Sequence, residues 1–322
     1  MQTPDAHTDA HHEGRDEPTR RRGPPDRRWP APGEPAAKPG GNAETTAPNT
    51  GTRLSAAEIH ENVRVAAEEE MRRPASDLAW SALAAGLTIA FSFLASAYLT
   101  LWVRPEFAPA AVAIGYPLGF IFVVQARNQL FTENTLEPVI PFLQRRDRKT
   151  LGLVFRIWGI VLAGNLVGAF VFALLARETS LLDEPMRRAM LHVATEGTSG
   201  GFGEVAYRAI FGGWLVALMA WLVSSTRATG AQIVYIWITT APISAFGFRH
   251  SIAGAVEAFY LAIAGAATWG EMLGGFLVPA VIGNVIGGVV LVAVLNHGQV
   301  ASAPGHEKSL PGDATRAVPN VS

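Results

Sequence analysis

Long apolar runs govern what this chain can fold into, and two of those runs are interrupted by charge and by Pro or Gly. Four segments each supply the roughly 20 mostly apolar residues that one helical membrane crossing requires: 80–102, 150–176, 204–226 and 272–296. Segments 109–144 and 230–265 are far longer than one crossing. We therefore expect an all-α membrane protein with six spans, in which the second and fifth helices are broken.

Basic residues orient these spans. They cluster before the first span, after the second and after the fourth: Arg72, Arg73, Arg145, Arg146, Arg148, Lys149 and Arg227. Because short cytoplasmic loops carry an excess of Lys and Arg, we expect these three sites and both termini on the cytoplasmic side. The preference for arginine over lysine is typical of a GC-rich bacterial genome, so the expected location is a bacterial inner membrane.

The regions outside the spans divide the chain into parts. Residues 1–53 have few aliphatic side chains to offset chain entropy, which predicts a disordered cytoplasmic tail. Residues 54–76 place apolar residues among charges with helical recurrence, which predicts a cytoplasmic amphipathic helix. The six-helix transporter domain is expected at 77–297, with its two repeats at about 78–176 and 204–297. A second disordered cytoplasmic tail is expected at 298–322.

Composition excludes several kinds of site. The chain has no cysteine, which removes disulfides, thiolate catalysis and cysteine metal ligands. His7, His11 and His12 could bind a metal, but short histidine tracts in flexible tails are usually incidental. The formal net charge of −1 gives no nucleic-acid signal. We expect no metal, no cofactor and no nucleic-acid partner.

A duplicated motif relates two halves of the apolar region. The string "GNLVGAF" begins at Gly164 and "GNVIGGV" begins at Gly283, 119 residues later. The same offset aligns three further pairs: Trp102 with Trp221, Tyr116 with Tyr235, and Phe131 with His250. Each repeat has three spans, so the second repeat starts on the opposite side of the membrane from the first. Its topology must therefore be inverted relative to that of the first repeat. Inverted repeats with paired broken helices are typical of transporters and channels that bind at the membrane midplane.

The small residues of this motif also suit helix packing. Glycines let membrane helices approach closely, and an asparagine amide can bond to nearby backbone. The expected packing positions are Gly164, Asn165, Gly168, Gly283, Asn284 and Gly287. Packing alone does not explain why the shared register extends beyond the motif, so we expect both duplication and packing.

Four separated motifs resemble one protein family. They are "QLFTENT" at 129–135, "GNLVGA" from residue 164, "GFRHSIAG" at 247–254 and "VPAVIGNVIGG" at 278–288. In order and spacing this region, about residues 78–297, resembles the formate/nitrite transporter family. The strings "ARNQLFTENT" and "HSIAGAVEAFYL" are most similar to its YfdC-like branch. The resemblance implies an aquaporin-like homopentamer, embedded in membrane lipid, with a separate pore in each protomer.

The resemblance also implies roles for individual residues. Leu130, Phe131 and Thr132 match the loop that gates the pore, and His250, followed by Ser251, matches the histidine at its centre. The positions that match the two apolar constrictions beside this histidine are Tyr116, Phe120, Val216 and Ile243. These residues define the expected substrate pore, and no catalytic residue is expected.

Charged residues in the broken segments depart from the family pattern. Arg249 replaces the usual acid before the histidine, and Gly213 stands where an asparagine lines the family's pore. The ionisable residues other than His250 in the two breaks are Arg127, Glu133, Glu137, Arg249 and Glu257. They form either a charged filter or structural pairs, and we favour Arg127 paired with Glu133 or Glu137, because an unpaired charge there is costly. Glu257, two helical turns after His250, could face the same lumen.

The expected function is passive or proton-coupled passage of a small monovalent weak-acid anion such as formate or nitrite. An imidazole can hydrogen-bond an anion and hand it a proton. One alternative is an aquaporin-like pore for small neutral solutes, and another is a scaffold that binds partners through its tail. A third, an intramembrane enzyme using Ser199 and His192, is disfavoured because both residues lie outside the spans in a Gly-rich region.

Overall fold

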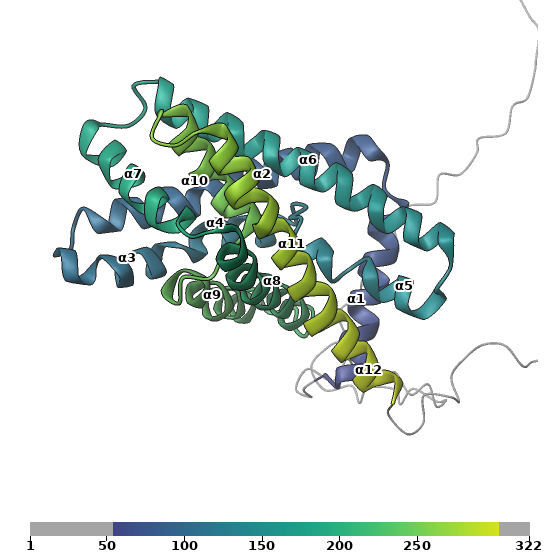
Figure 1. The fold of residues 1–322 in the computed structure, drawn as a ribbon. Helices are drawn as coiled ribbons and strands as arrows, with labels where there is room; N and C mark the ends of the chain where they lie inside the picture. Colours follow the sequence, from purple (N-terminus) through teal and green to yellow (C-terminus); the bar gives the residue numbers. More distant parts are fainter. Residues whose placement is uncertain (1–53, 303–322) are drawn as a thin grey trace, which may run out of the picture. The chain divides into compact units, whose positions relative to one another are not determined.

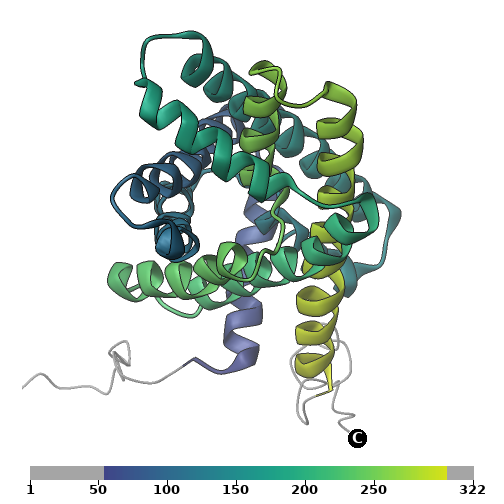
Figure 2. The ribbon, with the colours of Figure 1, turned by 60° about the vertical axis from the view of Figure 1, so that its left-hand side comes forward.

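The computed structural model describes residues 54–302, and every regular element in that range is a helix. The expected tails at 1–53 and after residue 302 lie outside the described residues. Figures 1 and 2 show the described helices gathered into a bundle. In chain order the elements are α1 (Ala56–Arg72), α2 (Ala75–Thr100), η1 (Pro105–Phe107), α3 (Ala108–Gly115), α4 (Pro117–Gln125), η2 (Glu133–Thr135), α5 (Val139–Arg145), α6 (Arg148–Glu178), α7 (Glu184–Thr198), α8 (Phe202–Val223), α9 (Thr229–Ala245), α10 (Ser251–Ile263), η3 (Glu271–Leu277), α11 (Val278–Ile286), η4 (Gly287–Val294) and α12 (Leu295–Ala301).

Five helical stretches in the described range are long and apolar enough to cross a membrane: Ala75–Thr100, Pro105–Gln125, Arg148–Glu178, Phe202–Val223 and Glu271–Val300. The predicted fifth span consists of α9, with 17 residues, and α10, with 13, separated at residues 246–250. The second is interrupted between α4 and α5. The broken second and fifth helices are therefore confirmed. The last span ends at Val300 and helix α12 at Ala301, both past the predicted start of the second tail at residue 298.

The two halves of the bundle pack in corresponding ways. In the first half α2 contacts α6 and α4, and in the second half α8 contacts α11 and α9. Each break also reaches into the opposite half, because η2 contacts α8 and η4, while α10 contacts α2 and α6. The halves are thus interlocked repeats, and both breaks lie inside the bundle, where protein surrounds the irregular backbone.

Both breaks begin with a residue in the left-handed backbone region. Arg127 has φ 55° and Gly247 has φ 66°. Glycine adopts this conformation freely, whereas for other residues it costs about 1–2 kcal/mol. The surrounding contacts must therefore hold the chain at Arg127. The two turns are 120 positions apart, one more than the offset of the duplicated motif.

An asparagine holds the first break in place. Asn165, on α6, accepts the backbone N–H of Phe131 at 2.8 Å. Its amide nitrogen donates to the carbonyls of Ala82 and Gln129, at 2.8 and 2.9 Å. The side chain is fully buried. It therefore satisfies two backbone groups of the break, the Phe131 N–H and the Gln129 carbonyl, and joins them to the Ala82 carbonyl of α2.

Asn284, on α11, makes the corresponding bonds to the second break and to α8. It accepts the N–H of Ser251 at 2.7 Å and donates to the carbonyls of Ala209 and Arg249, at 2.8 and 3.0 Å. The separation between asparagine and bound N–H is 34 residues in the first half and 33 in the second. The predicted alignment of Phe131 with His250 is wrong by one residue, because the segment between the break and its asparagine is one residue shorter in the second half. Leu130 is therefore the counterpart of His250.

Glycines allow the helices that carry these asparagines to pack closely. A Cβ would overlap atoms of the facing helix at each of the four motif glycines: Gly164, Gly168, Gly283 and Gly287. Gly213 has the same function from the α8 side, since a Cβ there would overlap the backbone of Asn284. Gly213 therefore lies in the contact between α8 and α11, and the pore position implied for it is not where the structure places it.

Helix α7 lies between the expected spans 150–176 and 204–226, where no helix was predicted. Asp183 caps it by accepting the Met186 N–H at 3.0 Å. Met186, Met190 and Val193 are buried along one face. In Figure 1, α7 lies at the end of the bundle away from α5 and α12. The cap and the apolar recurrence were readable signals, but the polar outer face resembles a loop in composition.

Helix α1 lies at the opposite end, where it contacts α5, α6, α8 and α12. Ser55 and Glu58 form a capping box at its start, and the bond from the Ser55 backbone N–H lowers the pKa of Glu58. Glu68 binds Arg145 of α5 at 2.6 Å. His60 and His297 of α12 lie 3.1 Å apart through ring nitrogens. The amphipathic helix is therefore joined to the bundle.

We expect Asn165→Ala to destabilise the protein, because it leaves two backbone groups of the first break, the Phe131 N–H and the Gln129 carbonyl, without partners. A buried orphaned polar group costs about 1–3 kcal/mol, so the free energy of unfolding should fall by at least about 2 kcal/mol. Thermal unfolding in detergent measures this as a lower midpoint. Asn62→Ala, which removes an exposed bond to the Ser224 carbonyl, is the matched control. Equal midpoints for the two variants would contradict the role given to Asn165.

Candidate functional site

His250 lies at the end of the second break, where it caps α10. Its Nδ1 accepts the backbone N–H of Ala253 at 3.0 Å. Its Nε2 lies 2.7 Å from the hydroxyl oxygen of Thr132, in the first break. Because Nδ1 is an acceptor, the neutral ring carries its proton on Nε2 and donates it to Thr132. The two residues are 2% and 0% exposed, so the breaks meet at one buried hydrogen bond.

Aromatic and aliphatic side chains surround this pair. The Phe120 ring lies 5.0 Å from the His250 ring at an interplanar angle of 75°, and Tyr116 lies 5.4 Å from Phe120. Val216 and Ile243, the residues matching the second constriction, are fully buried in the same core. The imidazole is therefore a polar group inside an apolar environment, with an aromatic ring packed against it.

The predicted gating loop is tied to α6 in this structure. Leu130 and Phe131 are buried, and the Phe131 ring lies edge-on to Trp158 at 6.2 Å. The Trp158 indole N–H donates to the carbonyl of Asn134 at 2.7 Å. These contacts, together with the bond from the Phe131 N–H to Asn165, fix Thr132 opposite His250.

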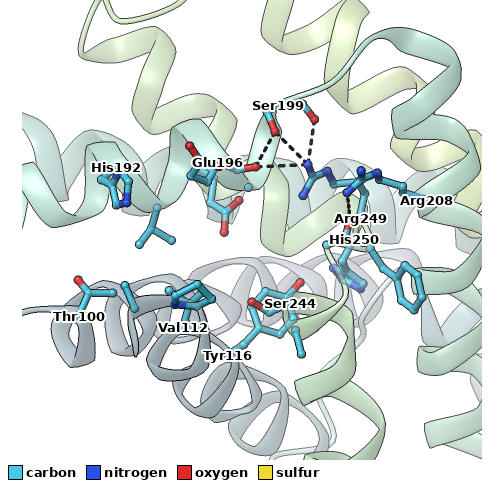
Figure 3. Close-up of a pocket in the computed structure, with 18 of the residues that line it drawn as sticks. Thr100, Val112, Tyr116, His192, Glu196, Ser199, Arg208, Ser244, Arg249 and His250 are labelled. Atoms are coloured by element: carbon cyan, nitrogen blue, oxygen red, sulfur yellow. Dashed lines mark hydrogen bonds between the residues drawn. The ribbon is translucent and has the colours of Figure 1, made fainter. Parts of the chain in front are cut away.

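A cavity of about 580 Å³ ends at His250. Its walls come from the end of α2, from η1, α3, α7, α8, α9 and α10, and from the second break. Figure 3 shows His250 at one side of this space with Tyr116, Glu196, Arg208 and Arg249 around it. The wall therefore combines charges of both signs with the phenol of one expected constriction. Arg208 and the residues of α7 were not among the expected site residues.

The arginines of the cavity are held by backbone oxygens. Arg249 donates Nη2 to the carbonyl of Ser199 at 2.9 Å and to that of Glu196 at 3.3 Å, at the C-terminal end of α7. This negative end of the helix dipole suits a cation. Arg208 donates to the Gly247 carbonyl at 3.2 Å. The second break is thus fastened both to α7 and to α8.

The charged residues of the first break do not pair as expected. No ion pair joins Arg127 to Glu133 or Glu137 within residues 54–302, and the Arg127 side chain is exposed. The left-handed turn at Arg127 directs its side chain to the surface of the bundle, where the guanidinium needs no ion-pair partner. Glu133 Oε1 is buried without a hydrogen-bond partner in the described part of the chain. By contrast, Glu257 does line the cavity.

The polar residues of the enzyme alternative are not arranged for catalysis. The Ser199 hydroxyl accepts from Arg249 at 3.2 Å and donates to the carbonyl of Glu196 at 2.9 Å. No hydrogen bond links it to His192 among the described residues. Ser251 holds the second break through its N–H. Between residues 54 and 302 no three His, Asp or Glu side chains form a group that could hold a metal. The histidine tract of the tail lies outside that range.

Interrupted helices are stable at membrane depth only where protein buries them or where they border a polar space. Here they do both, since the breaks meet inside the bundle and one of them borders the cavity. Together with the interlocked repeats, this defines a membrane channel or transporter.

The comparison with known proteins names the family. Residues 57–298 match the family described as "Formate/nitrite transporter", and the chain belongs to it. The inner membrane protein YfdC of Escherichia coli (strain K12) is 36% identical over 245 residues, which cover 75% of this chain and 78% of YfdC. A probable formate transporter of Methanothermobacter thermautotrophicus is 30% identical over 244 residues, covering 65% of this chain and 87% of that protein.

The fold agrees with solved structures of the family. A structure titled "Pentameric formate channel with formate bound" superposes with a TM-score of 0.56, at 20% sequence identity, over 69% of this chain and 95% of that one. The aquaporin-like bundle with two broken helices is therefore the fold of this chain.

We expect His250 to be the Nε2–H tautomer, because the Ala253 N–H occupies Nδ1. Nitrogen-15 NMR of protein labelled at histidine distinguishes a protonated ring nitrogen from an unprotonated one, and the spectrum of His250→Asn identifies the signals of His250. A proton on Nδ1 would contradict the hydrogen-bond assignment.

Proposed function

We propose that this protein is a channel, passive or proton-coupled, for small monovalent weak-acid anions such as formate, with one pathway in each protomer. The observation that supports this most is the His250–Thr132 pair, which joins the two breaks where the cavity ends. The relative with the same fold is titled as a formate channel with formate bound. In this proposal His250, Thr132 and the Leu130–Phe131 loop form the pathway.

The pair offers hydrogen bonds to an anion that has lost its water. Dehydration in an apolar surrounding costs several kcal/mol unless new hydrogen bonds replace the old ones. The Thr132 side chain moves aside, so that the His250 Nε2–H donates to the anion and the Thr132 hydroxyl donates a second bond. Nδ1 stays bound to the Ala253 N–H throughout, so the ring keeps its position while the anion passes.

The same geometry argues against His250 as the proton donor expected from its residue type. A neutral ring that gave up its Nε2 proton would become an imidazolate. A doubly protonated ring would lose the Ala253 hydrogen bond and place a positive charge at the positive end of α10. We therefore assign hydrogen bonding to His250, and a proton that accompanies the anion has to come from another group.

The cellular arrangement follows from the relatives and from the charges. The structurally similar formate channel is a pentamer, and YfdC is described as an inner membrane protein. We propose a homopentamer in a bacterial inner membrane. The end that carries α1, α5 and α12 faces the cytoplasm in this proposal, since the Arg145–Lys149 cluster lies there. The domain at 77–297 then carries transport, and the segment at 54–76 and the two tails are cytoplasmic.

A pore for small neutral solutes is the second candidate. A neutral imidazole and a hydroxyl can hydrogen-bond an uncharged solute as readily as an anion, and the described cavity carries acidic as well as basic residues. This candidate predicts that glycerol or water passes faster than formate and without dependence on pH.

Flux in proteoliposomes tests the proposed function. We expect Thr132→Val to reduce formate uptake by at least about tenfold, the effect of losing one hydrogen bond to a charged group. His250→Asn should do the same. Thr195→Val is the matched control, because Thr195 is exposed on α7 and bonds only its own helix. Uptake is measured for formate and glycerol at several pH values. Undiminished formate uptake in Thr132→Val would contradict the proposal, and faster glycerol uptake would favour the second candidate.

A further inference from the structure

Arg249 has hydrogen-bond donors that find no acceptor in the described part of the chain. Its Nη2 is occupied by the carbonyls of Glu196 and Ser199 and by the Ser199 hydroxyl. Its Nε is buried without a partner, and no acceptor within residues 54–302 is hydrogen-bonded to Nη1. The side chain is 7% exposed and lines the cavity next to His250. A buried guanidinium with free donors beside a cavity can accept an anionic ligand.

Glu257 faces the same cavity from α10. It is 6% exposed, and it makes neither a hydrogen bond nor an ion pair with the residues that the structure describes. Gly197 of α7 makes room for it, because a Cβ there would overlap the carboxylate. Arg249 and Tyr116 are close enough to interact with it electrostatically, without direct pairing. An unpartnered carboxylate in such a place is costly when it is ionised.

The charges around the cavity set the condition for binding an anion. Arg208 is paired with Glu204 at 2.8 Å, so it is already compensated. Arg249 forms no ion pair in the described part of the chain, and its charge is balanced by the nearby Glu257 and by the C-terminal end of α7. The other titratable groups that face the cavity are His192 and Glu196 of α7, Tyr116 before α4, and His250. An anion bound to Arg249 would therefore leave one excess negative charge beside Glu257, and one proton removes that excess.

We infer that the free donors of Arg249 form a carboxylate-binding subsite ahead of the His250–Thr132 pair, and that Glu257 takes up one proton as each anion binds. The ligand class is a small carboxylate or a comparable oxyanion. The proton then moves from the Glu257 carboxyl to an oxygen of the bound anion. This leaves Glu257 ionised beside Arg249 and produces the neutral acid, which crosses the apolar ring at Phe120. The inference deepens the proposed function and rests on it.

Binding is measured apart from transport by isothermal titration calorimetry, with formate added to the detergent-solubilised full chain. Repeating the titration in buffers of different ionisation enthalpy counts the protons taken up. In alkaline buffer, where Glu257 is ionised before formate binds, we expect about one proton per formate in the native protein, since one carboxyl is neutralised. Glu257→Gln should bind formate with no proton uptake. Arg249→Gln should weaken binding by at least about tenfold. The matched control is Arg188→Gln, an exposed arginine on α7 that should change neither quantity.

The outcomes separate this inference from the proposed function. His250→Asn should lose transport but still bind formate with one proton. Equal affinities in Arg249→Gln and Arg188→Gln would overturn the subsite, even if transport through the His250–Thr132 pair persists. Undiminished proton uptake in Glu257→Gln would overturn the assignment of the proton. If Arg249→Gln elutes as an aggregate in size exclusion, Arg249→Lys replaces it, which keeps the charge and should retain part of the affinity.

Discussion

A backbone that is interrupted inside a membrane has to find its hydrogen-bond partners within the protein, and two asparagines meet that requirement here. Asn165 and Asn284 each bind one N–H and one carbonyl of a break, and each also binds one carbonyl of a facing unbroken helix, α2 or α8. Glycines in the facing helices make room for both. The register that these bonds impose brings Thr132 and His250 within 2.7 Å, although they are 118 residues apart in the chain. The polar centre of the bundle is therefore a consequence of how its breaks are satisfied.

The two groups of polar residues divide the chemistry between them. At the centre, a neutral imidazole fixed by the N-terminus of α10 offers hydrogen bonds without charge. In the adjoining cavity, Arg249 and Glu257 bring charge of both signs close to the path without forming a direct pair. Such an arrangement suits an anion that is first bound by a positive charge and then neutralised by a proton before it enters an apolar ring. It also gives Arg249, which departs from the family pattern just before His250, the role of binding the anion.

The sequence predicted the fold well because the apolar runs, the repeated glycine and asparagine, and the interruptions are all local signals. The His250 and Thr132 motifs were readable for the same reason, and their proximity followed from the inverted repeat. Three features were missed. Helix α7 was taken for a connection because its outer face is polar, although its cap and apolar recurrence are local signals. The one-residue change of offset lay in a connection without a motif, and the exposure of Arg127 depended on a left-handed turn. The last two are decided by tertiary contacts that no short window of residues contains.

The central claim is that the Thr132 side chain lies on the path of the anion. The chain has no cysteine, so Thr132→Cys introduces the only thiol in it. The thiol is treated with methyl methanethiosulfonate, a small neutral reagent, in proteoliposomes, and formate uptake is followed with time. The account predicts that modification stops uptake and that formate slows the modification. A thiol that is modified at the same rate with and without formate, with uptake unchanged, would contradict it.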